Sequence, residues 1–251
     1  MSELSWALLI GAGLWAGAQN AFAGGGSFIT LPALILAGLD PRAANITSTL
    51  ALFPGQVATA FAGRSLVAGT YGLSFRSLFW ISLAGGALGA LLLLATPSRF
   101  FAALVPWLVL FATGAFAWGS FRRRSLDQLA AAVHLAPRTA GSLQFLIAIY
   151  GGYFGGGIGF LMLAVLTLAG QAVRNAGATK NALAAVMNAS AALILAFSPE
   201  AHWRAGALLC AGSIIGALIG SWMIHRVHEK VLRVLVVIIG ISLTVALFVN
   251  Y

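Results

Sequence analysis

The sequence predicts an all-α polytopic membrane protein built from two inverted-topology repeats. Of its 251 residues, 61% are hydrophobic and only 8% are charged, and its mean hydropathy is +0.98. Such a chain lacks the polar side chains to cover a water-facing surface, so the lipid bilayer must be its solvent. The second observation is a glycine triplet with similar flanking residues that occurs once in each half of the chain.

Apolar segments account for most of the chain, and most of them approach the roughly 20 residues that a helix needs to cross a bilayer. They are too long and too continuous for the strands of a membrane β-barrel, in which apolar and polar residues alternate. In chain order, the eight predicted spanning helices are 4–22, 44–63, 77–96, 100–119, 140–154, 176–197, 204–224 and 231–249.

The internal repeat is anchored on the triplets Gly24–Gly26 and Gly155–Gly157, each followed by a shorter apolar segment (27–38 and 158–170). Beyond the triplets, Ala44-x-x-Thr47-Ser48 aligns with Ala176-x-x-Thr179-Lys180, and Gln56 aligns with Asn188. Glycine-rich third spans and basic-flanked last spans also align. Self-similarity of this kind indicates duplication. We therefore predict one transmembrane domain with repeat 1 at 1–119, a linker at 120–139 and repeat 2 at 140–251.

The distribution of the 14 Lys and Arg residues predicts the topology. If each triplet lies inside one long span, seven basic residues fall on each side of the membrane. If the triplets are the tips of helical hairpins, eleven fall on one side and only Arg42, Arg99 and Arg204 on the other. Because cytoplasmic loops are enriched in Lys and Arg, we predict hairpins, inverted halves, periplasmic termini and a cytoplasmic 120–139 loop.

The second hairpin arms have about 12 residues, which rise only about 18 Å as helix and fall short of the hydrocarbon thickness. These arms are either re-entrant or cross the membrane with tilt. If they cross, the two hairpins bring the number of spans from eight to ten. Irregular backbone at membrane depth normally lines a cavity. Inverted repeats place two such tips near the midplane, where secondary transporters bind substrate.

The helix that begins after each tip carries partial positive charge at its unpaired N–H groups, which suits an anion. The next helix in each half carries polar residues at helical spacing. Lys180 is the one basic residue within a predicted span, where it either holds an anion or snorkels to the surface. Close glycine packing and interhelical hydrogen bonds are the competing explanations. The candidate substrate-binding residues are Gly24, Gly25, Gly26, Ser27, Thr47, Ser48, Thr49, Gln56, Gly155, Gly156, Gly157, Thr179, Lys180, Asn181 and Asn188.

Several function classes lack the residues that they require. All five acidic residues and all four histidines fall in predicted loops or termini, and Cys210 is the single cysteine. A buried proton relay, an intramembrane zinc site and a base-activated serine are therefore not expected. We predict no catalytic residues, no metal and no cofactor. The formal charge of +9 is spread over short loops, which indicates membrane orientation rather than nucleic-acid binding.

The paired glycine triplets, the Ala-x-x-Thr-Ser and Ala-x-x-Thr-Lys helix starts and the glycine-rich third spans resemble the sulfite exporter TauE/SafE family over essentially the whole chain. The resemblance implies a multi-pass protein of the bacterial plasma membrane that carries sulfite, organosulfonates, other sulfur-containing acids or small carboxylates. We expect a secondary transporter that exports such anions by alternating access. An anion channel, or a membrane scaffold or assembly factor that does not transport, remains the alternative.

Overall fold

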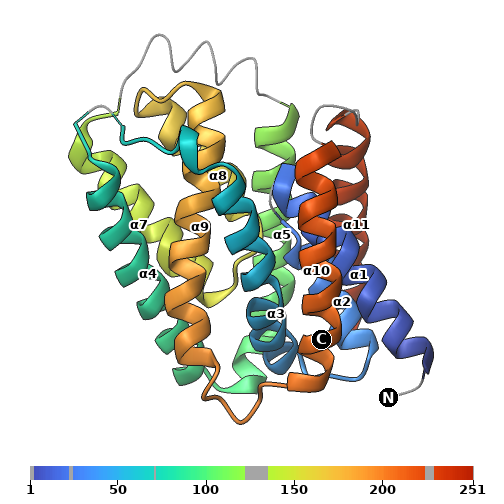
Figure 1. Cartoon of the computed structure of the whole chain (residues 1–251). Coiled ribbons are helices and arrows are strands. Elements are labelled where there is room, and N and C mark those ends of the chain that lie inside the picture. Colours follow the sequence, from blue (N-terminus) through green and yellow to red (C-terminus); the bar gives the residue numbers. More distant parts are fainter. Residues whose placement is uncertain (1–2, 23–24, 71, 122–134, 224–228, 251) are drawn as a thin grey trace.

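The computed structural model describes residues 3–22, 25–70, 72–121, 135–223 and 229–250. Within these ranges the chain forms ten α-helices, one short 3₁₀ helix and no β-strand, which confirms the predicted all-α class (Figure 1). The helices are α1 (Glu3–Phe22), α2 (Ser27–Leu36), α3 (Pro41–Ala62), α4 (Phe75–Ala95), α5 (Ser98–Phe121), α7 (Pro137–Tyr153), α8 (Ile158–Leu168), α9 (Val173–Leu195), α10 (Trp203–Met223) and α11 (Glu229–Asn250), with the 3₁₀ helix η1 (Arg64–Leu66) between α3 and α4.

In the part of the chain that the structure describes, four helices are long and apolar enough to cross a membrane: α4, α9 and the segments Ser98–Trp118 of α5 and Trp203–Trp222 of α10. Large apolar side chains on their outer faces, such as Leu91, Trp107 and Leu218, are more than half exposed in the isolated chain. Lipid tails would cover such faces at no hydrophobic cost. The chain is therefore a multi-pass membrane protein. The predicted number of eight spans remains a prediction.

The turn that ends each short helix is the same in both halves. Gly38 follows α2 at φ +96° and Gly170 follows α8 at φ +90°, a left-handed conformation that glycine adopts without steric penalty. Around Gly38, the N–H of Leu39 donates to the Leu34 carbonyl at 3.1 Å, and around Gly170 the N–H of Gln171 donates to Leu166 at 3.0 Å. These bonds form the Schellman C-cap, which satisfies the last carbonyls of each short helix and reverses the chain.

Helices of the two halves pack against each other rather than only among themselves. In Figure 1, α7 lies beside α4 on the left and α10 beside α1 on the right, and both pairs have extensive contacts. In addition, α3 contacts α10, α9 contacts α4, and α3 and α9 contact each other at the centre. The two halves make corresponding contacts when α1, α3 and α4 are matched with α7, α9 and α10. The α1–α10 contact then corresponds to the α7–α4 contact, and the α3–α10 contact corresponds to the α9–α4 contact.

Glycines permit the closest of these helix crossings. A Cβ on Gly212 or Gly216 of α10 would overlap the carbonyl oxygens of Ile10 and Leu14 on α1. A Cβ on Gly86 or Gly89 of α4 would likewise overlap backbone of α9 and α7. Small residues allow this backbone approach, which replaces the hydrophobic driving force that is missing between helices in lipid.

An aromatic cluster joins the two short helices behind their first turns. Phe116 of α5 stands between Phe28 of α2 and Phe160 of α8, with ring centroids 6.2 Å and 4.3 Å away in edge-to-face geometry. All three side chains are buried. Edge-to-face pairs add about 0.5–1.5 kcal/mol each beyond area burial, so this cluster fixes how the starts of α2 and α8 face each other.

We expect Gly216→Ala to lower the melting temperature of the purified protein, because the new methyl group has to separate α10 from α1. Gly114→Ala is the matched control, since a Cβ there meets nothing within 4 Å and alanine favours a helix interior by up to about 1 kcal/mol. Thermal unfolding in detergent should therefore shift down for Gly216→Ala and stay level or rise for Gly114→Ala. Equal shifts would contradict the packing role assigned to Gly216.

Candidate functional site

The two glycine segments interrupt the helices where the sequence predicts hairpin tips. Gly25 has φ +85° before α2, and Gly155 and Gly157 have φ +80° and +74° before α8. Any L-residue would be strained at these three positions. Gly24, the first residue of the first triplet, lies outside the described residues.

A small cavity lies between the two tips, with a volume of about 30 Å³. This volume is about two to three times the minimum that holds one water molecule, so the space fits a compact ligand. The cavity is bounded by α1, the two tips, the second half of α3 and the first half of α9. Its lining residues are Asn20, Gly25, Ser27, Gln56, Thr59, Gly155, Ile158, Gly159, Lys180, Asn181 and Ala184.

Six of the sequence candidates thus meet around one space, although they come from distant parts of the chain: Gly25, Ser27, Gln56, Gly155, Lys180 and Asn181. Whether they bind substrate stays a prediction. Lys180 does not snorkel to the outside, because only 4% of its surface is exposed.

The charge balance of the cavity is positive. No carboxylate lines it, and the Lys180 ammonium forms no hydrogen bond or ion pair with any described residue. A lone charge in a low-dielectric interior carries a large desolvation penalty unless a counter-charge or water compensates it. An anion in the cavity would supply that compensation.

Backbone donors at the start of α8 add to this positive potential. Within the described chain, the N–H groups of Ile158 and Gly159 have no acceptor, whereas Phe160 N–H donates to the Gly157 carbonyl at 3.2 Å. Ile158 and Gly159 both line the cavity. Unpaired N–H groups in the first turn carry the positive end of the helix dipole and bind anions readily.

Asn188 lies behind the cavity rather than on its wall. Its Nδ2 donates to Gln56 Oε1 at 2.8 Å, and only Gln56 of the two is among the lining residues. The bond leaves the Gln56 amide nitrogen as the group available to a ligand. Asn188 therefore holds a lining residue in place.

Thr47 and Thr179 connect the two central helices to loops instead of reaching the cavity. Thr47 Oγ1 accepts from the His202 N–H at 3.1 Å, and Thr179 Oγ1 accepts from the Ala68 N–H at 3.1 Å. Each threonine thus fastens the loop that follows the other central helix. Gln171 strengthens the second connection by donating to the Ala68 and Gly69 carbonyls.

The remaining candidates have local packing roles. Ser48 shares a 2.5 Å hydrogen bond with Thr30 of α2, and Thr49 donates to the Asn45 carbonyl one turn earlier at 3.0 Å. The other three candidates, Gly26, Gly156 and Gly157, belong to the glycine tips. The N–H of Gly26 donates to Asn20, while a Cβ on Gly156 or Gly157 would press on Phe154 or Ala112.

Sequence reasoning missed the lining residue Asn20, whereas Thr59 is one of the polar residues that helical spacing places on the helix of Gln56. Asn20 sits in the last turn of α1 and its Oδ1 accepts from the Gly26 N–H at 2.8 Å. A polar residue near the end of an apolar span, just before the glycine triplet, was the available signal. Thr59 follows Gln56 at helical spacing, and its hydroxyl donates to the Gly55 carbonyl at 3.0 Å.

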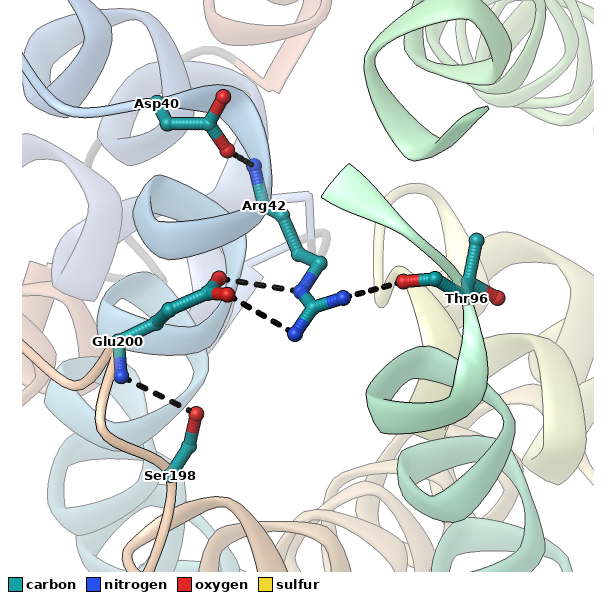
Figure 2. Close-up of polar contacts among 5 residues, drawn as sticks. All are labelled: Asp40, Arg42, Thr96, Ser198 and Glu200. Atoms are coloured by element: carbon teal, nitrogen blue, oxygen red, sulfur yellow. Dashed lines mark hydrogen bonds and ion pairs between the residues drawn. The ribbon is translucent and has the colours of Figure 1, made fainter. Parts of the chain in front are cut away.

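An ion pair closes the opposite end of the central helices (Figure 2). The Arg42 guanidinium contacts both carboxylate oxygens of Glu200, with Nε–Oε2 3.0 Å and Nη2–Oε1 2.9 Å, and also donates to the Thr96 carbonyl. It thereby joins the start of α3 to the α9–α10 loop and to the end of α4. Arg42 precedes Gln56 by about 14 residues, which is roughly 21 Å along the helix axis.

We expect Arg42→Gln to lower the stability by about 1 kcal/mol, because it removes a bidentate, partly buried ion pair and leaves the Thr96 carbonyl without its donor. Arg174→Gln is the matched control, since Arg174 is the aligned residue at the start of α9 and is exposed. Melting temperatures in detergent should fall for Arg42→Gln alone. A similar fall in both variants would attribute the effect to net charge.

Comparison with known proteins gives a consistent result. The family model described as "Sulfite exporter TauE/SafE" matches residues 9–247. A "Probable membrane transporter protein" of Haemophilus influenzae is 29% identical over 246 residues, covering 95% of this chain and 92% of the relative. "Probable membrane transporter protein ORF9" of Sinorhizobium sp is 32% identical over 247 residues, covering 97% and 92%. "Probable membrane transporter protein YfcA" of Escherichia coli K12 is 28% identical over 249 residues, covering 96% and 88%. No solved structure matches the chain.

Proposed function

Because this chain belongs to the sulfite exporter TauE/SafE family, we propose that it is a secondary transporter that exports small anions across the bacterial inner membrane. The substrates would be sulfite, organosulfonates or related sulfur-containing or carboxylic acids. The observation that carries the proposal is the Lys180 ammonium, which lines a cavity between two glycine tips and has no counter-charge among the described residues. The family is one of transporters, and no catalytic step is proposed.

The membrane potential makes export of an anion favourable. A cell that is negative inside releases about 2.3 kcal/mol for each negative charge that leaves across 100 mV. The positive cavity lowers the barrier for the anion at membrane depth, because the Lys180 charge and the α8 N–H groups replace its lost hydration. On this account no coupling ion is required.

Three contacts support the proposal that the halves are inverted repeats. Gln56 and Asn188, which the repeat aligns, bond directly to each other where α3 meets α9. Thr47 and Thr179, which it also aligns, accept from the loops after α9 and α3 at the same distance. Equivalent residues that meet in this reciprocal way are expected about a two-fold axis between two antiparallel central helices.

Alternating access follows from the two ends of the central helices. The cavity lies toward the end of α3 and the start of α9, whereas Arg42, Glu200 and Thr96 close the other end (Figure 2). We propose that the arrangement described here faces the cytoplasm. The outward-facing state would then require the Arg42 contacts to separate.

The proposed topology places both termini in the periplasm and the 120–139 loop in the cytoplasm. In Figure 1 the start of α1 and the end of α11 lie at the lower end of the bundle, and α5 ends and α7 begins at the upper end. This arrangement agrees with the eleven-to-three distribution of basic residues.

The transport prediction concerns uptake of labelled sulfite into proteoliposomes with an imposed potential. We expect saturable, potential-sensitive uptake that falls at least about tenfold in Lys180→Met, which keeps the apolar stem and removes the charge. Arg174→Gln is the control, because it removes a positive charge outside the cavity. Non-saturable flux without counterflow would indicate a channel. Unchanged saturable flux in Lys180→Met would remove Lys180 from the proposed site, and no anion flux would favour a scaffold.

The topology prediction uses single cysteines on a Cys210→Ser background. We expect Ser2→Cys to react with a membrane-impermeant maleimide in spheroplasts, because the N-terminus faces the periplasm. Ser125→Cys should react only after the membrane is permeabilised. The reverse pattern would disprove the orientation without affecting the fold.

A further inference from the structure

The hydrogen bond from the Gly26 N–H determines how the side-chain amide of Asn20 is oriented. A backbone N–H can only donate, so the 2.8 Å bond from Gly26 N–H requires the Asn20 side chain to present its oxygen to the tip. The amide nitrogen Nδ2 is then the part of the side chain left over. Within the described chain, Nδ2 has no acceptor.

The position of Asn20 makes this unused donor relevant to the cavity. Asn20 lies on the cavity wall formed by α1, while Lys180 lies on the α9 wall and the Ile158 and Gly159 N–H groups lie at the start of α8. Donors on three separate elements therefore surround one small space. An anion with several oxygens can accept from all three elements at once, whereas a monatomic anion offers a single centre.

Asn20 also breaks the equivalence of the two halves. The repeat aligns it with Gly151, which has no side chain and packs against Met187 and Ile158. The second tip therefore contributes bare backbone N–H groups, and the first tip contributes a side-chain amide. The proximity is possible because Gly26 lacks a Cβ, which would lie 2.7 Å from Asn20 Nδ2.

We propose that Asn20 is a substrate-binding residue whose Nδ2 donates a hydrogen bond to an oxygen of the transported anion. This donor makes the site selective for oxyanions such as sulfite and sulfonates over halides. The inference rests on the proposed function, because it assumes that the Lys180 cavity holds the anion.

The test separates the donor role of Asn20 from its role at the tip. Asn20→Asp keeps an oxygen for the Gly26 N–H but replaces the donor with a second acceptor. Asn20→Leu removes the donor without adding charge. Asn175→Asp, at the start of α9 and away from the cavity, is the control for added charge. Binding of sulfite, methanesulfonate and iodide is measured from the ligand-dependent melting temperature of each purified variant.

We expect both Asn20 variants to bind sulfite at least about tenfold more weakly, which is the loss typical of a hydrogen bond to a charged group. Iodide binding should change less than sulfite binding in Asn20→Leu, and Asn175→Asp should bind both as the unmodified protein does. If Asn20→Leu does not fold, Asn20→Asp still tests the donor, because it retains the contact with Gly26.

Different failures have different meanings. Wild-type affinity for sulfite in a folded Asn20→Asp protein would overturn the inference and leave the proposed function intact. An equal loss of sulfite and iodide in Asn20→Leu would also overturn it, because that pattern indicates a collapsed cavity. No stabilisation of the unmodified protein by either oxyanion would overturn both proposals.

Discussion

The arrangement of this protein depends on one electrostatic constraint: a lysine ammonium is buried among helices, and no carboxylate of the described residues lies beside it. In hydrocarbon such a charge is unfavourable, and a protein retains it where an ion or water compensates it. Lys180 lies where the second chain reversal also leaves the Ile158 and Gly159 N–H groups unpaired within the described chain. The positive charge and the partial charges reinforce each other, which is the physical basis for the proposal that the cavity binds an anion.

The surrounding packing holds these polar groups in position. Glycines let α10 approach α1 and α4 approach α7 to backbone contact, and the Phe28–Phe116–Phe160 cluster fixes the starts of the short helices. The Schellman turns after α2 and α8 then direct the chain into the central helices, which carry Gln56 and Lys180. Apolar packing thus determines where the few polar side chains lie, because association in lipid depends on close contact.

The two ends of the central helices are closed by different contacts although the contacts of the halves correspond. The Thr47 and Thr179 bonds are alike, but the Thr47 end adds the Arg42–Glu200 ion pair, and the Thr179 end adds the Gln171 bonds to Ala68 and Gly69. At the aligned position Arg174 is exposed. Unequal closures on the two sides would bias a two-state transporter toward one orientation by the difference in their free energies. The ion pair lies at the end away from the cavity.

The membrane class, the helical composition, the glycine interruptions and the isolation of Lys180 follow from composition and local spacing, so they can be predicted from the amino-acid sequence. The family is also indicated there, since the glycine and threonine motifs are short local patterns. Which polar residues face the cavity depends instead on how the helices pack. Thr47, Ser48, Thr49, Thr179 and Asn188 share the helices of Gln56 and Lys180, yet their hydrogen bonds go to loops, to neighbouring helices or, for Thr49, to its own helix. Helical spacing defines a face of a helix but not the element that packs against it, and Asn20 entered the site because a chain reversal folded its helix end back onto the tip.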